Sequence, residues 1–110
     1  MRPVSTIDLI LHIGAGPWSK DHFPDDPLVP GSVLLNEISN ALRAADARLG
    51  ALTNIVQARF MRRVVAPAVL QVRAQHKADR VDFTAIDQAT GAAAVRGSFC
   101  FAVAADVEGA

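Results

Sequence analysis

Hydrophobic and polar positions change their spacing along the chain, and each change marks an expected element. Residues 4–13, VSTIDLILHI, are rich in β-branched and aliphatic side chains and predict a first strand. From Gly31 the apolar residues recur at helical spacing, at Val33, Leu34, Leu35, Ile38, Ala41, Leu42, Ala45 and Leu49. This spacing predicts a helix from about Ser32 to Arg48. Gly50 is expected to end it in the left-handed cap conformation.

The remainder of the sequence predicts three or four strands. NIVQARFMRRVV runs to Pro67, AVLQVRAQHK and RVDFTAID alternate apolar with polar residues, and AAAVRGSFCFAVA follows the turn QATG. A strand, a long helix and then consecutive antiparallel strands favour an α+β fold in which one sheet covers one helix. No repeat or linker interrupts the pattern, so residues 1–110 are interpreted as a single domain.

Composition adds an expectation about assembly. Apolar residues make up 51% of the 110, which is rich for so short a chain, and we expect part of this surface to meet another subunit. Because the formal net charge is zero, the overall charge gives no reason to expect binding to nucleic acid or to a membrane surface. The N-terminal segment lacks the apolar core of a signal peptide, because Asp8 and His12 interrupt it, and no run is long enough to span a bilayer. A cytoplasmic protein is therefore expected.

Metal and disulfide chemistry have little support in the sequence. The single cysteine, Cys100, excludes an intrachain disulfide framework and is interpreted as a buried strand thiol. His12 and His76 fall in strand patterns with no second ligand nearby in the sequence, so no metal site is expected.

The candidate chemistry lies in SKDHFPDDPLVPGS, just before the helix. Prolines at 24, 27 and 30 fix their own φ angles and restrict the preceding residues, which predicts a stiff loop. A constrained loop that ends at a helix N-terminus can hold an acceptor oxygen on unpaired backbone N–H groups. An imidazole ordinarily titrates near working pH, so His22, at the start of this loop, could serve as a base.

Residues 22–36, HFPDDPLVPGSVLLN, resemble the signature of the β-hydroxyacyl-[acyl carrier protein] dehydratases. The matching positions, at that family's spacing, are His22, Phe23, Pro24, Pro27, Pro30 and Gly31. The downstream run ARFMRRVVAP also resembles a strand of the family. The resemblance implies the hot-dog fold, a curved antiparallel sheet wrapped around a central helix, assembled as a homodimer or as a higher oligomer of dimers.

The resemblance also implies a site shared between two subunits. His22 would act as the base, and the Gly31 amide would bind the thioester carbonyl with Ser32 beside it. Phe23 and Pro30 would contact the substrate, as would Asn40, which stands where the family often carries a glutamine. The acyl group would arrive on the phosphopantetheine of an acyl carrier protein in fatty-acid or polyketide-like biosynthesis, without a metal or redox cofactor. A cis peptide between His22 and Phe23 is implied as well.

One position departs from the family pattern. Asn36 stands fourteen residues after His22, where the family carries an acid, and an amide cannot deliver a proton to a leaving hydroxyl. Glu37 is adjacent, but one residue turns a helix by about 100°, so it would replace the acid only if the helix were rotated. We expect the apolar stripe to centre on Leu34, Ile38, Ala41 and Ala45, opposite Asn36, Asn40 and Arg43.

Other interpretations stay open beside the dehydratase. A non-catalytic acyl-thioester-binding module would explain the missing acid, and a hot-dog thioesterase would need Glu37 or Asp25 aimed at the thioester. His22 could be a loop residue without a role, and Glu37 a solvated surface acid. Arginines 59, 62, 63 and 73 could meet an acidic carrier protein or form a solvated strand face.

Overall fold

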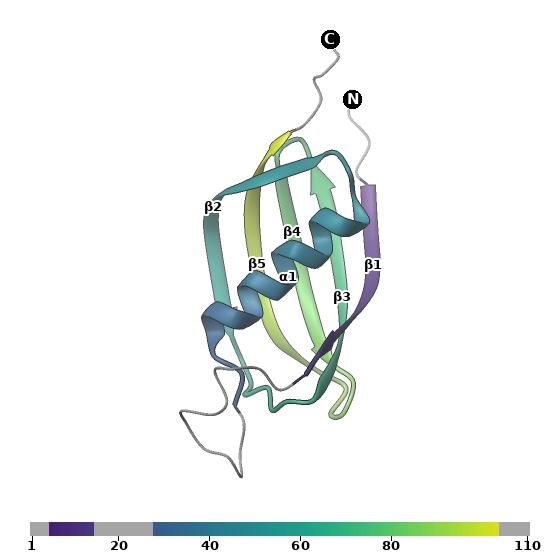
Figure 1. Cartoon of the computed structure of the whole chain (residues 1–110), viewed down its shortest axis with the longest axis vertical. Coiled ribbons are helices and arrows are strands. Elements are labelled where there is room, and N and C mark those ends of the chain that lie inside the picture. Colours follow the sequence, from purple (N-terminus) through teal and green to yellow (C-terminus); the bar gives the residue numbers. More distant parts are fainter. Residues whose placement is uncertain (1–4, 15–27, 104–110) are drawn as a thin grey trace.

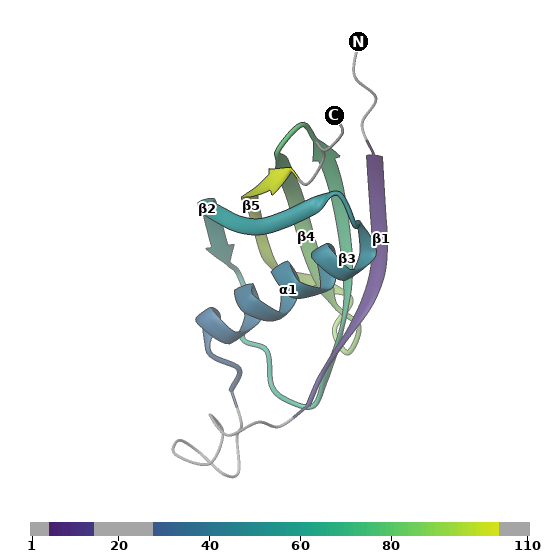
Figure 2. The ribbon, with the colours of Figure 1, turned by 45° about the horizontal axis from the view of Figure 1, so that its top comes forward.

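A curved antiparallel sheet wraps around one helix. The computed structural model describes residues 5–14 and 28–103. Its elements are β1 (Ser5–Ile13), α1 (Gly31–Ala45), β2 (Leu49–Phe60), β3 (Ala68–Lys77), β4 (Arg80–Asp87) and β5 (Ala92–Val103). In this part of the chain the strand order is β1-β3-β4-β5-β2, with α1 across one face (Figure 1). The turned view shows the sheet curving around α1 (Figure 2). The predicted α+β architecture and hot-dog fold are confirmed.

Alternation of apolar and polar residues sets the two faces of the central strands. On β3 the side chains of Leu70, Val72 and Ala74 are buried, and on β4 those of Val81 and Phe83 are buried. Every neighbouring pair of strands is antiparallel, so residues that pair across the sheet share one face. The apolar face meets α1, and the polar face points away from it. Both strands have the bounds that the alternation predicts.

The helix packs on the sheet through a shorter stripe than the sequence suggests. Leu34, Ile38 and Leu42 are at most 2% exposed, and Ser39 is also buried. Ala41 is half-buried, whereas Ala45 is exposed, so the expectation that Ala45 lies in the stripe is wrong. At about 100° per residue Ala45 still falls on the side of the helix that carries Leu34 and Ile38, but it is the last residue of α1, and the chain continues in an extended conformation from Asp46.

The helix ends earlier than predicted, and Gly50 is not its cap. Asp46 takes an extended conformation (φ −132°) directly after Ala45, and its N–H donates to Leu42 O. Gly50 belongs to β2, where a β-carbon would lie 2.7 Å from Ala102 O on β5. This position requires glycine because the two backbones approach closely, not because the chain turns left-handed.

The strand expected to reach Pro67 is also different. β2 begins at Leu49 and ends at Phe60, because Met61 and Arg62 both donate their N–H groups to Ala94 O, at 2.8 and 3.3 Å. The chain then leaves the sheet. Unlike β3 and β4, β2 is exposed at every position from 51 to 57.

The predicted burial of the single cysteine is wrong. Cys100 is only half-buried on β5. Three phenylalanines join the strands on the inner face: the Phe83 and Phe99 rings lie 4.7 Å apart, and Phe99 meets Phe101 edge-on at 5.9 Å.

Across residues 5–14 and 28–103, no helix has the length and apolar character needed to cross a membrane.

Candidate active site at the start of α1

Tertiary hydrogen bonds hold the segment that leads into α1. The N–H of Val29 donates to Val64 O at 2.8 Å, and Leu28 forms an isolated antiparallel bridge with Val65. The chain that leaves the sheet after β2 therefore runs beside residues 28–30. Pro30 follows in an extended conformation (φ −59°, ψ 147°), and its carbonyl accepts the N–H of Leu34 at 3.0 Å. The first turn of α1 is fixed by these contacts.

The backbone amides of this first turn lack the usual side-chain cap. Pro30 occupies the N-cap position, and within the described ranges no side chain caps the helix start. The first turn also carries no acidic residue. The amides of Gly31, Ser32 and Val33 precede the first intrahelical donor, Leu34. They present the positive end of the helix dipole, an arrangement suited to an oxygen acceptor.

An apolar groove of about 420 Å³ lies beside these amides. Its lining residues come from the segment before α1, the first helical turn and the chain that follows β2: Leu28, Val29, Gly31, Leu34, Phe60, Met61, Arg62, Arg63 and Val64. Apolar side chains form most of the wall, and the two arginines are exposed. A groove of this kind suits an apolar chain that ends in a polar group.

The ring of Phe60 lies over Gly31. A β-carbon at position 31 would lie 2.9 Å from Cζ of that ring, which is closer than real β-carbons approach their neighbours. Phe60 nevertheless remains 48% exposed, and Met61 beside it is 38% exposed. The glycine therefore lets an aromatic side chain pack directly on the helix start, where it forms part of the groove wall.

Three of the predicted site residues share a different face of the helix. Ser32, Asn36 and Asn40 are spaced by four residues and are all exposed, so they form a polar ridge along α1. None of them lines the groove within the same chain. Glu37 is half-buried on the flank of the helix, as expected. Asn36 additionally accepts a hydrogen bond on its backbone oxygen from the Ser39 hydroxyl at 3.0 Å.

The structure therefore brings part of the predicted site together. Gly31 lies in the groove, and Pro30 is the half-buried residue before it. Ser32, Asn36 and Asn40 lie on the ridge. His22 and Phe23, together with the implied cis peptide between them, fall outside the described residues.

Sequence reasoning misses the role of Phe60 and Met61 in the groove. Both belong to ARFMRRVVAP, whose pattern predicts one continuous strand. Only the three-dimensional contact between Phe60 and Gly31, 29 positions apart in the numbering, shows that this segment forms a wall of the site. The presence of a glycine directly after a proline, at the start of a helix, is the signal in the sequence that a close contact is needed there.

A second polar cluster, also missed, lies at the opposite end of α1. The Asp46 carboxylate accepts hydrogen bonds from Arg48 Nε (3.0 Å) and Nη2 (2.8 Å). His76, buried on β3, lies with Nδ1 2.8 Å from the same carboxylate and Nε2 2.7 Å from Ala78 O. Arg48 also reaches the Ser5 hydroxyl on β1 at 3.0 Å. The cluster ties the helix end to two strands.

Arg48 dominates the electrostatics of this cluster. Its hydrogen bonds hold the pKa of Asp46 well below the ordinary value, against the opposing effect of burial, and His76 acts in the same direction as Arg48. The carboxylate is therefore ionised whenever the fold is intact near neutral pH. Among residues 5–14 and 28–103, no three His, Cys, Asp or Glu side chains gather closely enough to hold a metal ion. We interpret the cluster as a structural tie.

Comparison with known proteins places the chain in a family. Residues 5–98 match the ApeI-like family, described as ApeI dehydratase. The chain belongs to the ApeI-like dehydratase family. Dehydratases are hydro-lyases, and the match includes β1, α1 and the groove at the helix start. The resemblance seen in the sequence to a hot-dog dehydratase is confirmed.

Solved structures show the same fold at low sequence identity. A chain of the dehydratase heterocomplex ApeI:P from Xenorhabdus doucetiae is 16% identical and superposes with a TM-score of 0.68, over 86% of this chain and 87% of that one. An uncharacterised protein from Erwinia carotovora subsp. atroseptica is 18% identical, with a TM-score of 0.74, over 94% and 87% of the two chains. No curated protein matches the sequence.

Proposed function

We propose that this member of the ApeI-like dehydratase family removes water from 3-hydroxyacyl thioesters carried on the phosphopantetheine of an acyl carrier protein, in fatty-acid or polyketide-like biosynthesis. The observation that carries the proposal is the start of α1, which no described side chain caps and which opens on an apolar groove in a dehydratase-family chain. The backbone N–H of Gly31 would donate a hydrogen bond to the thioester carbonyl oxygen. The acyl chain would then lie against the apolar wall that includes Phe60 and Met61.

The reaction assigns a role to each remaining residue. His22 takes the α-proton, and the electron pair moves onto the carbonyl oxygen, where the helix-start amides stabilise the developing charge. The pair then returns to form the α–β double bond as the β-hydroxyl leaves with a proton, as water. Asn36 would position the hydroxyl or the water by hydrogen bonding but cannot supply that proton. The imidazolium formed in the first step is the acid that the assigned residues provide.

We place the complete site across a homodimer. Asn36 is exposed on the helix and lies outside the groove of its own chain, so it would face the His22 loop of a second subunit. The edge strand β2 supports such an assembly. In the described part of the chain it pairs only with β5, and it exposes Leu52, Ile55 and Val56 at 36–46%. An unpaired edge with exposed apolar side chains favours strand pairing with another chain.

Sedimentation tests the assembly. Replacing both Ile55 and Val56 by lysine should convert the dimer to a monomer and abolish turnover, whereas lysines at the exposed turn positions Gln88 and Ala89 should leave the dimer intact. A wild-type monomer in solution would contradict the proposed shared site.

A second assembly is favoured by one observation. The family acid is replaced by Asn36, and the similar chain from Xenorhabdus doucetiae belongs to a dehydratase heterocomplex. A different hot-dog subunit could supply the carboxylic acid that this chain lacks. In that arrangement the purified chain alone would be inactive, and adding the second subunit would restore turnover without any change to Asn36.

One assay separates the proposed activity from its rivals. The purified protein is incubated with a 3-hydroxyacyl thioester and a saturated acyl thioester, each on a carrier protein and on coenzyme A. Enoyl product supports the dehydratase, free thiol from both substrates points to a thioesterase, and no turnover points to an acyl-binding module. His22→Ala should abolish dehydration. Asn36→Asp should raise it, because general acid help is typically worth about 10²–10⁴ in rate.

The outcome for Glu37 discriminates further. If Glu37→Gln removes activity and Asn36→Asp adds none, Glu37 supplies the acid instead. If the Asn36→Asp protein folds normally but is inert on every acyl length and carrier, both alone and with a second subunit, the dehydratase assignment fails.

A further inference from the structure

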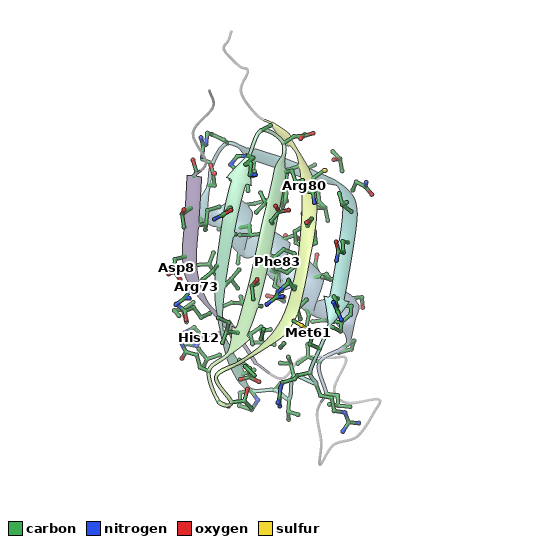
Figure 3. The ribbon with its side chains drawn as sticks, turned by 180° about the vertical axis from the view of Figure 1, so that it is seen from behind. Asp8, His12, Met61, Arg73, Arg80 and Phe83 are labelled. Atoms are coloured by element: carbon green, nitrogen blue, oxygen red, sulfur yellow. The ribbon has the colours of Figure 1, made fainter. Side chains whose placement is uncertain are left out.

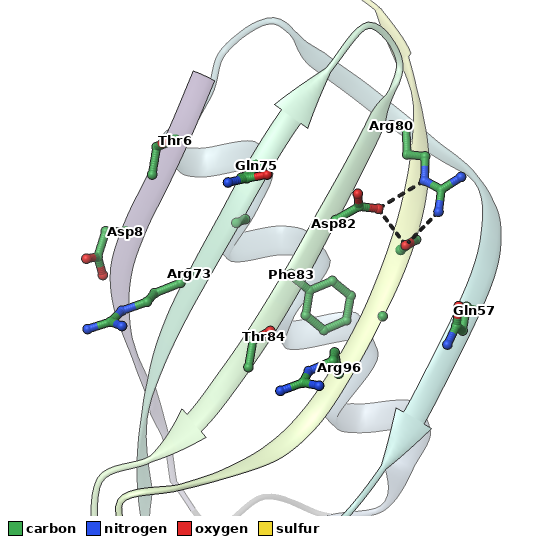
Figure 4. A pocket seen from close by; sticks show the side chains of 13 residues that line it. Thr6, Asp8, Gln57, Arg73, Gln75, Arg80, Asp82, Phe83, Thr84 and Arg96 are labelled. Atoms are coloured by element: carbon green, nitrogen blue, oxygen red, sulfur yellow. Dashed lines mark hydrogen bonds and ion pairs between the residues drawn. The ribbon is translucent and has the colours of Figure 1, made fainter. Parts of the chain in front are cut away.

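The sheet face that points away from α1 carries a row of polar side chains across all five strands, and four of the five are charged. Cross-strand pairing places Asp8 opposite Arg73, Arg73 opposite Thr84, Thr84 opposite Arg96, and Arg96 opposite Arg59. Figure 3 shows this face, and Figure 4 shows its central part at close range. We call these five residues the basic row. It contains three arginines and one acid.

The arginines of the basic row have no ion-pair partner among the described residues. Arg59, Arg73 and Arg96 are all exposed and form no salt bridge within residues 5–14 and 28–103. Asp8, the single acid of the row, accepts a hydrogen bond from Gln71 at 3.2 Å. In Figure 4 the Arg96 side chain extends toward Thr84 and that of Arg73 toward β1. Their guanidinium groups are available to an acceptor.

The neighbouring row along the strands provides an internal comparison. There Arg80 donates to Asp82 at 2.9 Å and to the Ser98 hydroxyl at 3.2 Å, and Ser98 donates to Asp82 at 2.6 Å. The Ser98 hydrogen bond, assisted by Arg80, lowers the pKa of Asp82. The Asp82 charge on this face is therefore matched by Arg80 within the chain, whereas the arginines of the basic row have no such partner among the described residues.

The basic row also contains a direct repulsion. Arg59 and Arg96 are opposite each other on β2 and β5, and like charges at directly opposed cross-strand positions destabilise a sheet. Four members of the basic row, Asp8, Arg73, Thr84 and Arg96, line an open hollow of about 550 Å³ together with Arg80, Asp82 and Ser98. A negatively charged partner would relieve the repulsion and fill the hollow.

We infer that the basic row is a docking surface for an acidic helix of a partner protein. A second copy of this chain fits poorly, because the same face carries Arg59, Arg73, Arg80 and Arg96 against only Asp8 and Asp82, and two such faces would repel. A nucleic acid also fits poorly, because both acids would meet its phosphates on a chain of zero net charge. An acidic protein surface matches the excess of arginine.

The spacing of the row indicates how the helix would lie. Neighbouring strands are about 4.8 Å apart, so Arg96 lies about one strand spacing from Arg59, and Arg73 about three. A helix rises about 1.5 Å per residue, so carboxylates at positions i, i+4 and i+11 share one face and span about 6 and 16 Å. Such a helix, laid across the strands, would present one carboxylate to each arginine. This surface is separate from the groove at the start of α1.

A designed peptide tests the inference. The probe is a helical peptide with glutamates at i, i+4 and i+11, compared with a peptide that carries glutamines there. Titration into the isotopically labelled full-length protein at low salt should shift backbone amides around Arg73, Thr84 and Arg96 only with the glutamate peptide. The affinity should fall with added salt.

Charge-matched variants make the test specific. Arg73→Gln with Arg96→Gln should weaken binding about tenfold or more, whereas Arg43→Gln with Arg62→Gln, which removes the same charge elsewhere, should change it less than about twofold. Arg96→Gln alone should not lower the melting temperature, because it removes the repulsion with Arg59. Equal weakening by both double variants, shifts centred on Gly31, or tighter binding of duplex DNA to the same face would overturn the inference.

Discussion

Gly31→Ala tests whether the close packing of Phe60 on the helix start shapes the site. The new β-carbon would lie 2.9 Å from Cζ and 3.1 Å from Cε1 of Phe60, and ordinary contacts begin at 3.4 Å, so the ring must retreat by about 0.5 Å (3.4 − 2.9). Phe60 is 48% exposed and can move, at a cost of about 1 kcal/mol for an off-rotamer side chain. Alanine has a higher helix propensity than glycine, which stabilises a helix by up to about 1 kcal/mol.

These two effects nearly cancel, so the free energy of unfolding should change by less than about 1 kcal/mol. Turnover should nevertheless fall, because the displaced ring and the added methyl group occupy the position beside the Gly31 amide. Misplacement by about 1 Å at a reacting centre can cost about 10² in rate. Urea denaturation and formation of enoyl product measure the two quantities separately.

Phe60→Ala provides the matched background. It removes the clashing ring, so Gly31→Ala should cost less activity in that background, and the double-mutant cycle should give a clear coupling between the two positions. Gly14→Ala is the control, because among the described residues no atom beyond its chain neighbours would lie within 4 Å of a β-carbon there. Unchanged turnover in Gly31→Ala, or additive effects of the two substitutions, would refute the reasoning.

Two other predictions concern stability. Asp46→Asn should lower the free energy of unfolding at neutral pH by about 2 kcal/mol, because it removes charged hydrogen bonds to Arg48. The pKa of Asp46 is lower in the folded state than in the unfolded state, where it is about 4. The stabilisation by the Asp46 carboxylate is therefore present above about pH 4 and is lost as the pH falls through the pKa of the folded state. Urea unfolding measured at a series of acidic pH values should show this loss in the wild type and not in the variant. Gly97→Ala should destabilise by about 3 kcal/mol, because the β-carbon would lie 2.5 Å from the backbone oxygen of Gln57. A change in Gly97→Ala as small as that in Gly14→Ala, by the same measurement, would contradict this.

The sequence predicts the central strands well for a physical reason. β3 and β4 each bury one face on α1 and expose the other, so apolar and polar residues alternate and define their bounds. β2 lacks that signal, because residues 51–57 are exposed on both faces in the single chain. Its limits depend on hydrogen bonds of Met61 and Arg62 to Ala94, which no local pattern reveals.

The two ends of the helix differ in the same way. Pro30 and Gly31 mark its start locally, through fixed φ and the need for a close approach. Its end is set by Asp46, whose carboxylate meets His76 thirty residues away. A glycine such as Gly50, soon after a helix, is a local signal for a helix cap. Here the position needs a glycine because the backbone of Ala102 on β5 lies too close for a β-carbon.

The helix start joins stability to chemistry. A side-chain cap is worth about 1 kcal/mol to a helix but occupies the amide groups that it satisfies. This chain places Pro30 there instead, so none of the described side chains occupies the amides, and the first turn is held by the Val29–Val64 hydrogen bond and the Leu28–Val65 bridge. The segment that replaces the cap, between Phe60 and Val64, also lines the groove. The same segment therefore stabilises the helix start and forms the groove wall beside its amides. A substitution that loosens this segment should lower both the stability of the helix start and the activity.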